Sequence, residues 1–188
     1  MSLSHSSMLP LGTEIPSFSL LDSNEVKHQL DKGSFNGYIL AFICNHCPYV
    51  INIKDKMSQI LNAALEKDFS IYAINSNDSI KYPLDNAQMI KKDIIEYKYK
   101  FPYLVDKSQY VAKKFQTVCT PEFYIFNNKK LLVYRGRFDD SSPGNNKLAR
   151  GDDIKKVINF INQGKPVPKS HFPSMGCSIK WKEENKIH

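Results

Sequence analysis

The stretch that decides the fold runs from Tyr38 to Val50 and reads YILAFICNHCPYV. It begins with an unbroken apolar run over residues 38–43. Such a run is typical of a strand whose side chains are buried on both faces, as in a parallel sheet. Cys44 and Cys47 follow directly, and from Val50 onward the apolar residues are spaced as in a helix. The stretch therefore predicts a buried strand, then a CxxC pair, then a helix.

The flanking sequence extends this pattern into a mixed α/β domain. Apolar residues recur every three or four positions from Val50 to Ala64, which predicts an amphipathic helix, and residues 69–74 predict the next strand. Strand, helix and strand in this order form a βαβ unit. The later segments predict a helix over 87–97, a short strand over 103–105, an antiparallel hairpin from 122–126 and 130–134, and a final helix from Asp152 to Gly164. We expect a central mixed sheet flanked by helices on both faces.

The chain length predicts one domain with short additions at its ends. A chain of 188 residues is long enough for one full hydrophobic core. We expect a flexible lead-in over residues 1–15 and the α/β domain over 16–164, which opens with a hairpin from 18–20 and 26–30. Residues 165–188 predict a tail that packs on the domain, because large aromatic side chains in it favour burial.

The composition excludes several classes of protein. The formal net charge is +7, but 23 of the 26 basic residues are lysines scattered among acidic residues, so we expect a solvated surface and no nucleic-acid partner. No apolar run approaches the roughly 20 residues that span a bilayer, so we expect no membrane partner. The first twelve residues lack the features of a signal peptide, which favours a cytoplasmic location where thiols stay reduced.

The cysteine pair is the main candidate for chemistry. Cys44 lies at the carboxyl end of the predicted strand and at the start of the predicted helix, where backbone N–H groups and the helix dipole favour a thiolate. His46 lies between the two cysteines and, when protonated, stabilises a thiolate further. A redox pair of Cys44 and Cys47 is the main hypothesis and needs no organic cofactor or metal. A metal site using Cys44, His46 and Cys47, a redox-sensing module and an inert pair stay open.

A second candidate region is Cys119-Thr120-Pro121, where a proline opens a predicted strand. Cys119 is either a third redox thiol near the pair or a small buried side chain, which free cysteine commonly is. Cys177 lies in the tail, and two roles for it stay open: a bridge to Cys119, or a resolving thiol.

Arg137 is a candidate electrostatic residue. It alternates with Arg135 around Gly136 at the end of a predicted strand, so the two arginines point to the same face. Arg137 either holds the loop at Asp139 and Asp140 or lines the site and favours a bound anion.

Together these motifs resemble the thioredoxin superfamily, in which a CxxC pair at a strand-to-helix junction is followed by a βαβ unit, a Thr-Pro that opens a hairpin, and a closing helix. The segments CNHCPYV, FPYLVD, CTPEFYIF, YRGRFDDSSPGN and GCSIKW are similar to a peroxiredoxin-like branch, akin to the alkyl hydroperoxide reductase and thiol-specific antioxidant group. The resemblance covers residues 15–182.

The resemblance implies a role for each site residue. Cys44 is then the exposed attacking thiol and Cys47 the resolving thiol. Pro121 is cis, and the backbone of Thr120 pairs with an extended substrate. The implied activity is thiol–disulfide exchange with a protein or small-molecule disulfide as the substrate and a reducing partner. The resemblance also implies an antioxidant role.

The sequence departs from the family patterns in two places. Peroxiredoxins carry Pro-x-x-x-Thr/Ser-x-x-Cys at the peroxidatic thiol, but Gly37 and Ala41 stand at those positions before Cys44, and Leu40 and Cys44 stand there before Cys47. Thioredoxins carry a buried Asp six residues before the first cysteine, where this chain has Tyr38. The hydroxyl that would bind a peroxide is missing, so thiol–disulfide exchange is the main hypothesis and thiol-dependent peroxidase activity is the alternative.

Overall fold

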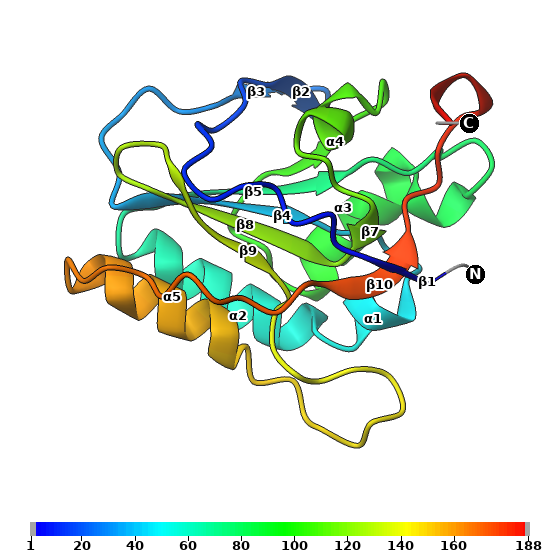
Figure 1. Cartoon of the computed structure of the whole chain (residues 1–188). Helices are drawn as coiled ribbons and strands as arrows, with labels where there is room; N and C mark the ends of the chain where they lie inside the picture. Colours follow the sequence, from blue (N-terminus) through cyan, green and yellow to red (C-terminus); the bar gives the residue numbers. More distant parts are fainter. Residues whose placement is uncertain (1–2, 187–188) are drawn as a thin grey trace.

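The computed structural model describes residues 3–186 and centres on a seven-stranded sheet (Figure 1). The strand order is β3-β2-β6-β5-β4-β8-β9. Strands β4, β5 and β6 are parallel, while β8, β9 and the β2–β3 hairpin add antiparallel strands at the two sides. The strands are β2 (Ser19–Asp22), β3 (Lys27–Gln29), β4 (Gly37–Phe42), β5 (Phe69–Asn75), β6 (Tyr103–Val105), β8 (Glu122–Asn127) and β9 (Leu132–Gly136). This is the mixed α/β, thioredoxin-like architecture expected from the sequence.

Strand β4 lies in the interior of the sheet because its side chains are apolar on both faces. Ile39 and Ala41 belong to one buried cluster, and Tyr38, Leu40 and Phe42 belong to the other. Every residue of β4 is buried, with β5 on one side and β8 on the other. The carboxyl end of β4, where the cysteine pair begins, is thereby fixed by two neighbouring strands.

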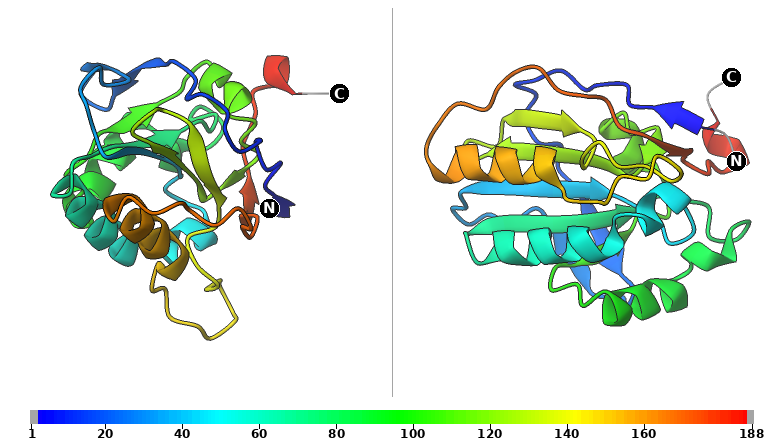
Figure 2. Two further views of the ribbon diagram at one scale, coloured as in Figure 1. Left: turned by 60° about the vertical axis from the view of Figure 1, so that its left-hand side comes forward. Right: turned by 90° about the horizontal axis from the view of Figure 1, so that it is seen from below.

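Helices cover both faces of the sheet (Figure 2). Helices α2 (Lys54–Leu65), α3 (Ala87–Glu96) and α5 (Asp152–Asn162) contribute to the cluster around Ile39, and α4 (Tyr110–Lys114) contributes to the opposite cluster. The helix predicted to begin at Val50 differs in one respect, because a short α1 (Pro48–Ile51) precedes α2 and turn residues separate the two. No helix within residues 3–186 has the length and apolar character that crossing a bilayer requires.

A second sheet joins the two ends of the chain. Strand β10 (Met175–Ser178) lies between β1 (Leu3–His5) and β7 (Cys119–Thr120), antiparallel to both. The prediction of a flexible lead-in over residues 1–15 is therefore wrong for the part that the structure describes. Backbone pairing with β10 holds β1, and the buried side chains of Leu9 and Ile15 anchor the residues that follow. The tail supplies both β10 and the buried Ile179.

Candidate active site

The cysteine pair lies beyond the carboxyl end of β4, beside the residue that precedes Pro121. The Thr120–Pro121 peptide bond is cis, as the resemblance implies. Thr120 contacts both cysteines: its Oγ1 lies 3.2 Å from the Sγ of Cys44, and its carbonyl oxygen lies 3.3 Å from the Sγ of Cys47. The strand β4 and the Thr-Pro segment, 76 residues apart, thus form one site.

The state of the two thiols corrects one expectation. Cys44 was expected to be exposed and ionised, yet its exposed fraction is 1% and that of Cys47 is 0%. A hydrogen bond to Cys47 and then burial, with the nearby charge of Asp85, raise the pKa of Cys44 well above its ordinary value. The pKa of Cys47 is lowered to about 5, chiefly by the hydrogen-bonding interaction with Cys44. Burial acts against this shift, and the hydrogen bond with Cys177 adds to it. The two thiols of the pair therefore differ: the pKa of Cys44 is raised and that of Cys47 is lowered.

The local backbone explains why a helix dipole does not ionise Cys44. Cys47, not Cys44, caps the first helix, and α1 is only four residues long. The field at a helix end arises from aligned peptide dipoles within the adjoining turns, so a single turn supplies little of it. Side-chain and backbone hydrogen bonds at the Cys47 sulfur stabilise the negative charge instead.

His46 is held by a buried carboxylate that the sequence reasoning missed. Its Nδ1 lies 2.7 Å from Oδ2 of Asp85, and its ring stacks on Tyr82 with the centroids 5.6 Å apart. Asp85 also accepts hydrogen bonds from the backbone N–H of Asn45 at 2.7 Å and from Nδ2 of Asn77 at 2.8 Å. Burial would raise the pKa of Asp85, but these hydrogen bonds outweigh it and the pKa is lowered. Asp85 therefore stays charged and orients His46.

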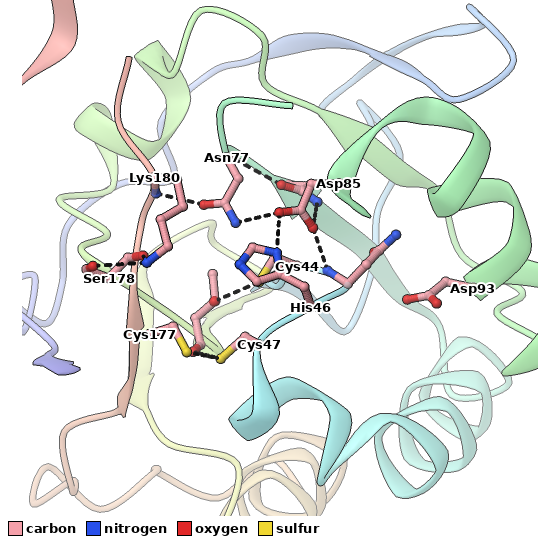
Figure 3. A network of polar contacts seen from close by, with 12 residues as sticks. Cys44, His46, Cys47, Asn77, Asp85, Asp93, Cys177, Ser178 and Lys180 are labelled. Atoms are coloured by element: carbon pink, nitrogen blue, oxygen red, sulfur yellow. Dashed lines mark hydrogen bonds and ion pairs between the residues drawn. The ribbon is translucent and has the colours of Figure 1, made fainter. Parts of the chain in front are cut away.

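The same network reaches the C-terminal segment (Figure 3). Oδ1 of Asn77 accepts a hydrogen bond from the backbone N–H of Lys180 at 2.8 Å, while its amide group donates to Asp85. The backbone N–H of Asp78 donates to the Lys180 carbonyl at 2.9 Å. Asn77 thus links the segment that follows β10 to the imidazole beside Cys44.

A buried ion pair supports the loop between the two cysteines. Lys54 is 3% exposed, and its ammonium group pairs with Asp93 on α3. The ammonium also donates to the carbonyl of Asn45 at 3.1 Å. Because Asn45 receives a bond from Lys54 at its carbonyl and gives one to Asp85 through its N–H, its peptide groups on both sides are fixed.

The other two cysteines occupy different surroundings. The Sγ of Cys177 lies 2.7 Å from the Sγ of Cys47, so the tail brings a third thiol into the site. Cys119 is fully buried on β7, and burial, together with the charge of Glu122, raises its pKa. Its register partner on β10 is Ser178, whereas Thr120 stands opposite Cys177. The structure therefore places Cys177 against Cys47 and does not place it opposite Cys119.

Arg137 is engaged away from the cysteines. Its Nε lies 2.8 Å from Oδ2 of Asp153 on α5, and its guanidinium group lies 4.1 Å from the ring centroid of Phe172. Asp139 is held differently, by backbone N–H groups of Arg150 and Gly151 at 2.6 Å. Arg137 thus connects the end of β9 to α5 and to the C-terminal segment, and its charge also helps lower the pKa of Asp140 in the neighbouring loop.

A possible metal-ligand group is present but differs from the one expected. One ligand atom each of Cys44, His46 and Asp85 lies within 4.8 Å of the other two. Cys47, the third ligand in the sequence hypothesis, faces Cys177 and Thr120 instead. Because both Asp85 oxygens already accept N–H groups, this carboxylate is satisfied by hydrogen bonds.

Comparisons with known proteins show similar chains over nearly the whole sequence. The chain resembles an uncharacterized conserved protein from Geobacillus kaustophilus, at 40% identity over 97% of this chain and 98% of that one, with a TM-score of 0.93. It also resembles a hypothetical protein from Sinorhizobium meliloti, at 34% identity over 95% and 98% of the two chains, with a TM-score of 0.92.

More distant structures show the same fold. The thioredoxin domain of a thiol-disulfide oxidoreductase from Bacteroides vulgatus has a TM-score of 0.62 at 17% identity, over 80% of this chain and 99% of that one. A search of curated proteins gave no significant match. The AhpC/TSA family profile matches residues 11–135, which is more than half of the sequence and includes the strand, the cysteine pair and the Thr-Pro segment. The chain is therefore a member of the AhpC/TSA family, a redoxin of the thioredoxin superfamily.

Proposed function

We propose that this redoxin is a thiol–disulfide oxidoreductase in which Cys44 and Cys47 form the reactive couple. The observation that carries the proposal is the placement of the pair beside the Thr-Pro segment: Thr120 Oγ1 lies 3.2 Å from the Cys44 sulfur, and the Thr120 carbonyl lies 3.3 Å from the Cys47 sulfur. The lowered pKa of Cys47 also favours exchange, because the thiolate is the attacking species.

Cys44 is the proposed attacking residue because it lies on the side of His46. The imidazole is near its sulfur and partly exposed, and it stacks on the half-exposed ring of Tyr82. A substrate disulfide that displaces these two rings reaches Cys44 first. His46 takes the proton of Cys44, the Cys44 sulfur bonds to one substrate sulfur, and the other substrate sulfur leaves as a thiolate that takes up this proton.

Cys47 then completes the reaction. Its thiolate attacks the Cys44 sulfur of the mixed disulfide, so that a Cys44–Cys47 disulfide forms and the second substrate thiolate leaves. Asp85 acts as a positioning residue through His46, by analogy with the third member of catalytic triads. A reducing partner returns the couple to the dithiol, and no organic cofactor or metal takes part. Such a cycle fits the cytoplasm, where thiols are kept reduced.

Peroxide reduction is the second candidate function. The Oγ1 of Thr120, 3.2 Å from the Cys44 sulfur, supplies a hydroxyl that the residues before the cysteines lack. Arg137, the arginine considered for the site, is held by Asp153 instead. Since a bound peroxide gains from both a hydroxyl and a cation, we favour disulfide exchange as the activity and rank peroxide reduction second.

The test is turnover of insulin disulfides with dithiothreitol as the reductant. We expect catalysis by the wild type and by Cys119→Ser, a control at a buried cysteine outside the pair, and the uncatalysed rate with Cys44→Ser. Hydrogen peroxide should be consumed no faster than by a free thiol. Catalysis by Cys44→Ser at the wild-type rate would contradict the proposal, and rapid peroxide consumption would favour the second candidate.

A further inference from the structure

The sulfur of Cys177 occupies a position beside the reactive pair that the proposed cycle does not use. It lies 2.7 Å from the Sγ of Cys47, although 130 residues separate the two cysteines in the sequence. All three sulfur-bearing residues are buried, and Cys177, at 5% exposure, is the most exposed of them. A thiol held this close to a redox-active sulfur is in position for exchange with it.

The backbone holds Cys177 in this place. Strand β10 is the middle strand of its sheet, and Cys177 stands opposite Thr120 in the register with β7. Its neighbour Gly176 permits this approach, because a Cβ at that position would overlap the Thr120 carbonyl. Lys180, two residues beyond β10, is tied through Asn77 to the Asp85–His46 pair. Cys177 is therefore fixed from both ends of its strand.

We propose that Cys177 is a third redox residue, which takes over the disulfide from the Cys44–Cys47 couple. The Cys177 thiolate attacks the Cys47 sulfur of the Cys44–Cys47 disulfide. A Cys47–Cys177 bond forms, the Cys44–Cys47 bond breaks, and Cys44 leaves as a thiolate that gains the proton lost by Cys177. This exchange inside the chain conserves two electrons and needs no further oxidant.

The exchange separates the two halves of the catalytic cycle. The substrate disulfide enters at Cys44, on the side of His46, and the reducing partner attacks at Cys177, on the side of β10. A dithiol reductant is the chemical class that fits, because its second thiol can release the mixed disulfide on Cys177. The inference deepens the proposed function and rests on it, since the Cys44–Cys47 disulfide must form first.

The test is a disulfide map of the oxidised wild-type protein. Reduced protein is treated with oxidised glutathione, quenched with acid, alkylated, digested without reduction and analysed by mass spectrometry. We expect a linked peptide of Cys47 with Cys177 and an alkylated Cys44. The variants Cys177→Ser and Cys177→Ala should carry only the Cys44–Cys47 link, and Cys119→Ser, the matched control, should give the wild-type map.

A magnitude follows from the same equilibrium. The oxidised protein is a mixture of the Cys44–Cys47 and the Cys47–Cys177 form. If the second makes up about nine tenths of it, only the remaining tenth can form without Cys177, so the equilibrium constant for oxidation by glutathione falls about tenfold. A wild-type map with Cys44–Cys47 alone and an alkylated Cys177 would overturn this inference and leave the proposed function intact. A wild type that forms no intramolecular disulfide would overturn both. Because these outcomes are read from the wild type, they do not depend on whether a variant folds.

Discussion

Replacing Asp85 with asparagine tests how the site is held together. Oδ1 of Asp85 accepts the N–H of Asn45 at 2.7 Å and the Nδ2 group of Asn75 at 3.2 Å. Oδ2 accepts Nδ2 of Asn77 at 2.8 Å and lies 2.7 Å from Nδ1 of His46. Because donors face both oxygens, the amide NH₂ of an asparagine must face an N–H group in either orientation.

The expected cost follows from these contacts. A buried N–H group left without an acceptor costs about 1–3 kcal/mol, and the loss of the charge weakens each remaining bond. We expect Asp85→Asn to lower the free energy of unfolding by about 3 kcal/mol. Since His46 loses its orienting partner, disulfide reduction should fall by at least about tenfold. Asp78→Asn is the matched control, because Asp78 is buried nearby and accepts backbone N–H groups of Ile80 and Lys81 instead.

Three measurements check this prediction. Urea unfolding gives the stability, insulin turnover gives the rate, and alkylation of Cys44 as a function of pH gives its thiol pKa. A hydrogen bond to Cys47 and burial contribute most to the raised pKa of Cys44, and the charge of Asp85 adds to them. Removing that charge should therefore lower the pKa of Cys44, and Asp78→Asn should leave it unchanged. An unchanged pKa together with unchanged stability would refute the reasoning.

Three further changes probe the surroundings of the site. Lys54→Met leaves the Asp93 carboxylate buried without its partner, so urea unfolding should show a loss of about 3–5 kcal/mol. Burial, only partly offset by the hydrogen bond from Ser6, raises the pKa of Glu122 to about 7 from 4.5. Between these pH values the native state keeps a proton that the unfolded chain has lost, so wild-type stability falls by about 3 kcal/mol as pH rises through this window. Unfolding of Glu122→Gln at a series of pH values should lack that fall. Gly176→Ala should displace β10 from Thr120, measured as faster alkylation of Cys177 in the native protein; an unchanged alkylation rate would contradict the close packing.

The fold could be predicted from the sequence because its signals are local. The run 38–43 is apolar at every position, which is typical of a strand covered on both faces, and the helical spacing after it defines the crossover. The break between α1 and α2 was not predictable, because the apolar spacing runs through it. The strand β1 in the N-terminal segment was not predictable either. Its backbone pairs with β10, and pairing between distant segments leaves no pattern in the sequence of either segment.

The site was predictable only in part, for the same reason. Cys44, His46 and Cys47 are adjacent in the sequence, but Asp85 and Cys177 reach them through the fold. One signal for the carboxylate was available: the polar residues after Ile74 end a strand parallel to β4, and carboxyl ends of adjacent parallel strands meet at one edge. The raised pKa of Cys44 could not be predicted, because it depends on burial and on hydrogen bonds that only the fold creates.

The most direct test of the Cys44–Cys47 couple is its reaction with Ellman's reagent, with each protein species weighed intact. In the wild type, attack at Cys44 should release one thionitrobenzoate, and attack by Cys47 should release a second, leaving a protein with an internal disulfide and no adduct. Cys47→Ser should stop after the first release, with the adduct mapped to Cys44. A persistent adduct on the wild type, or release by Cys47→Ser without an adduct on Cys44, would contradict the account.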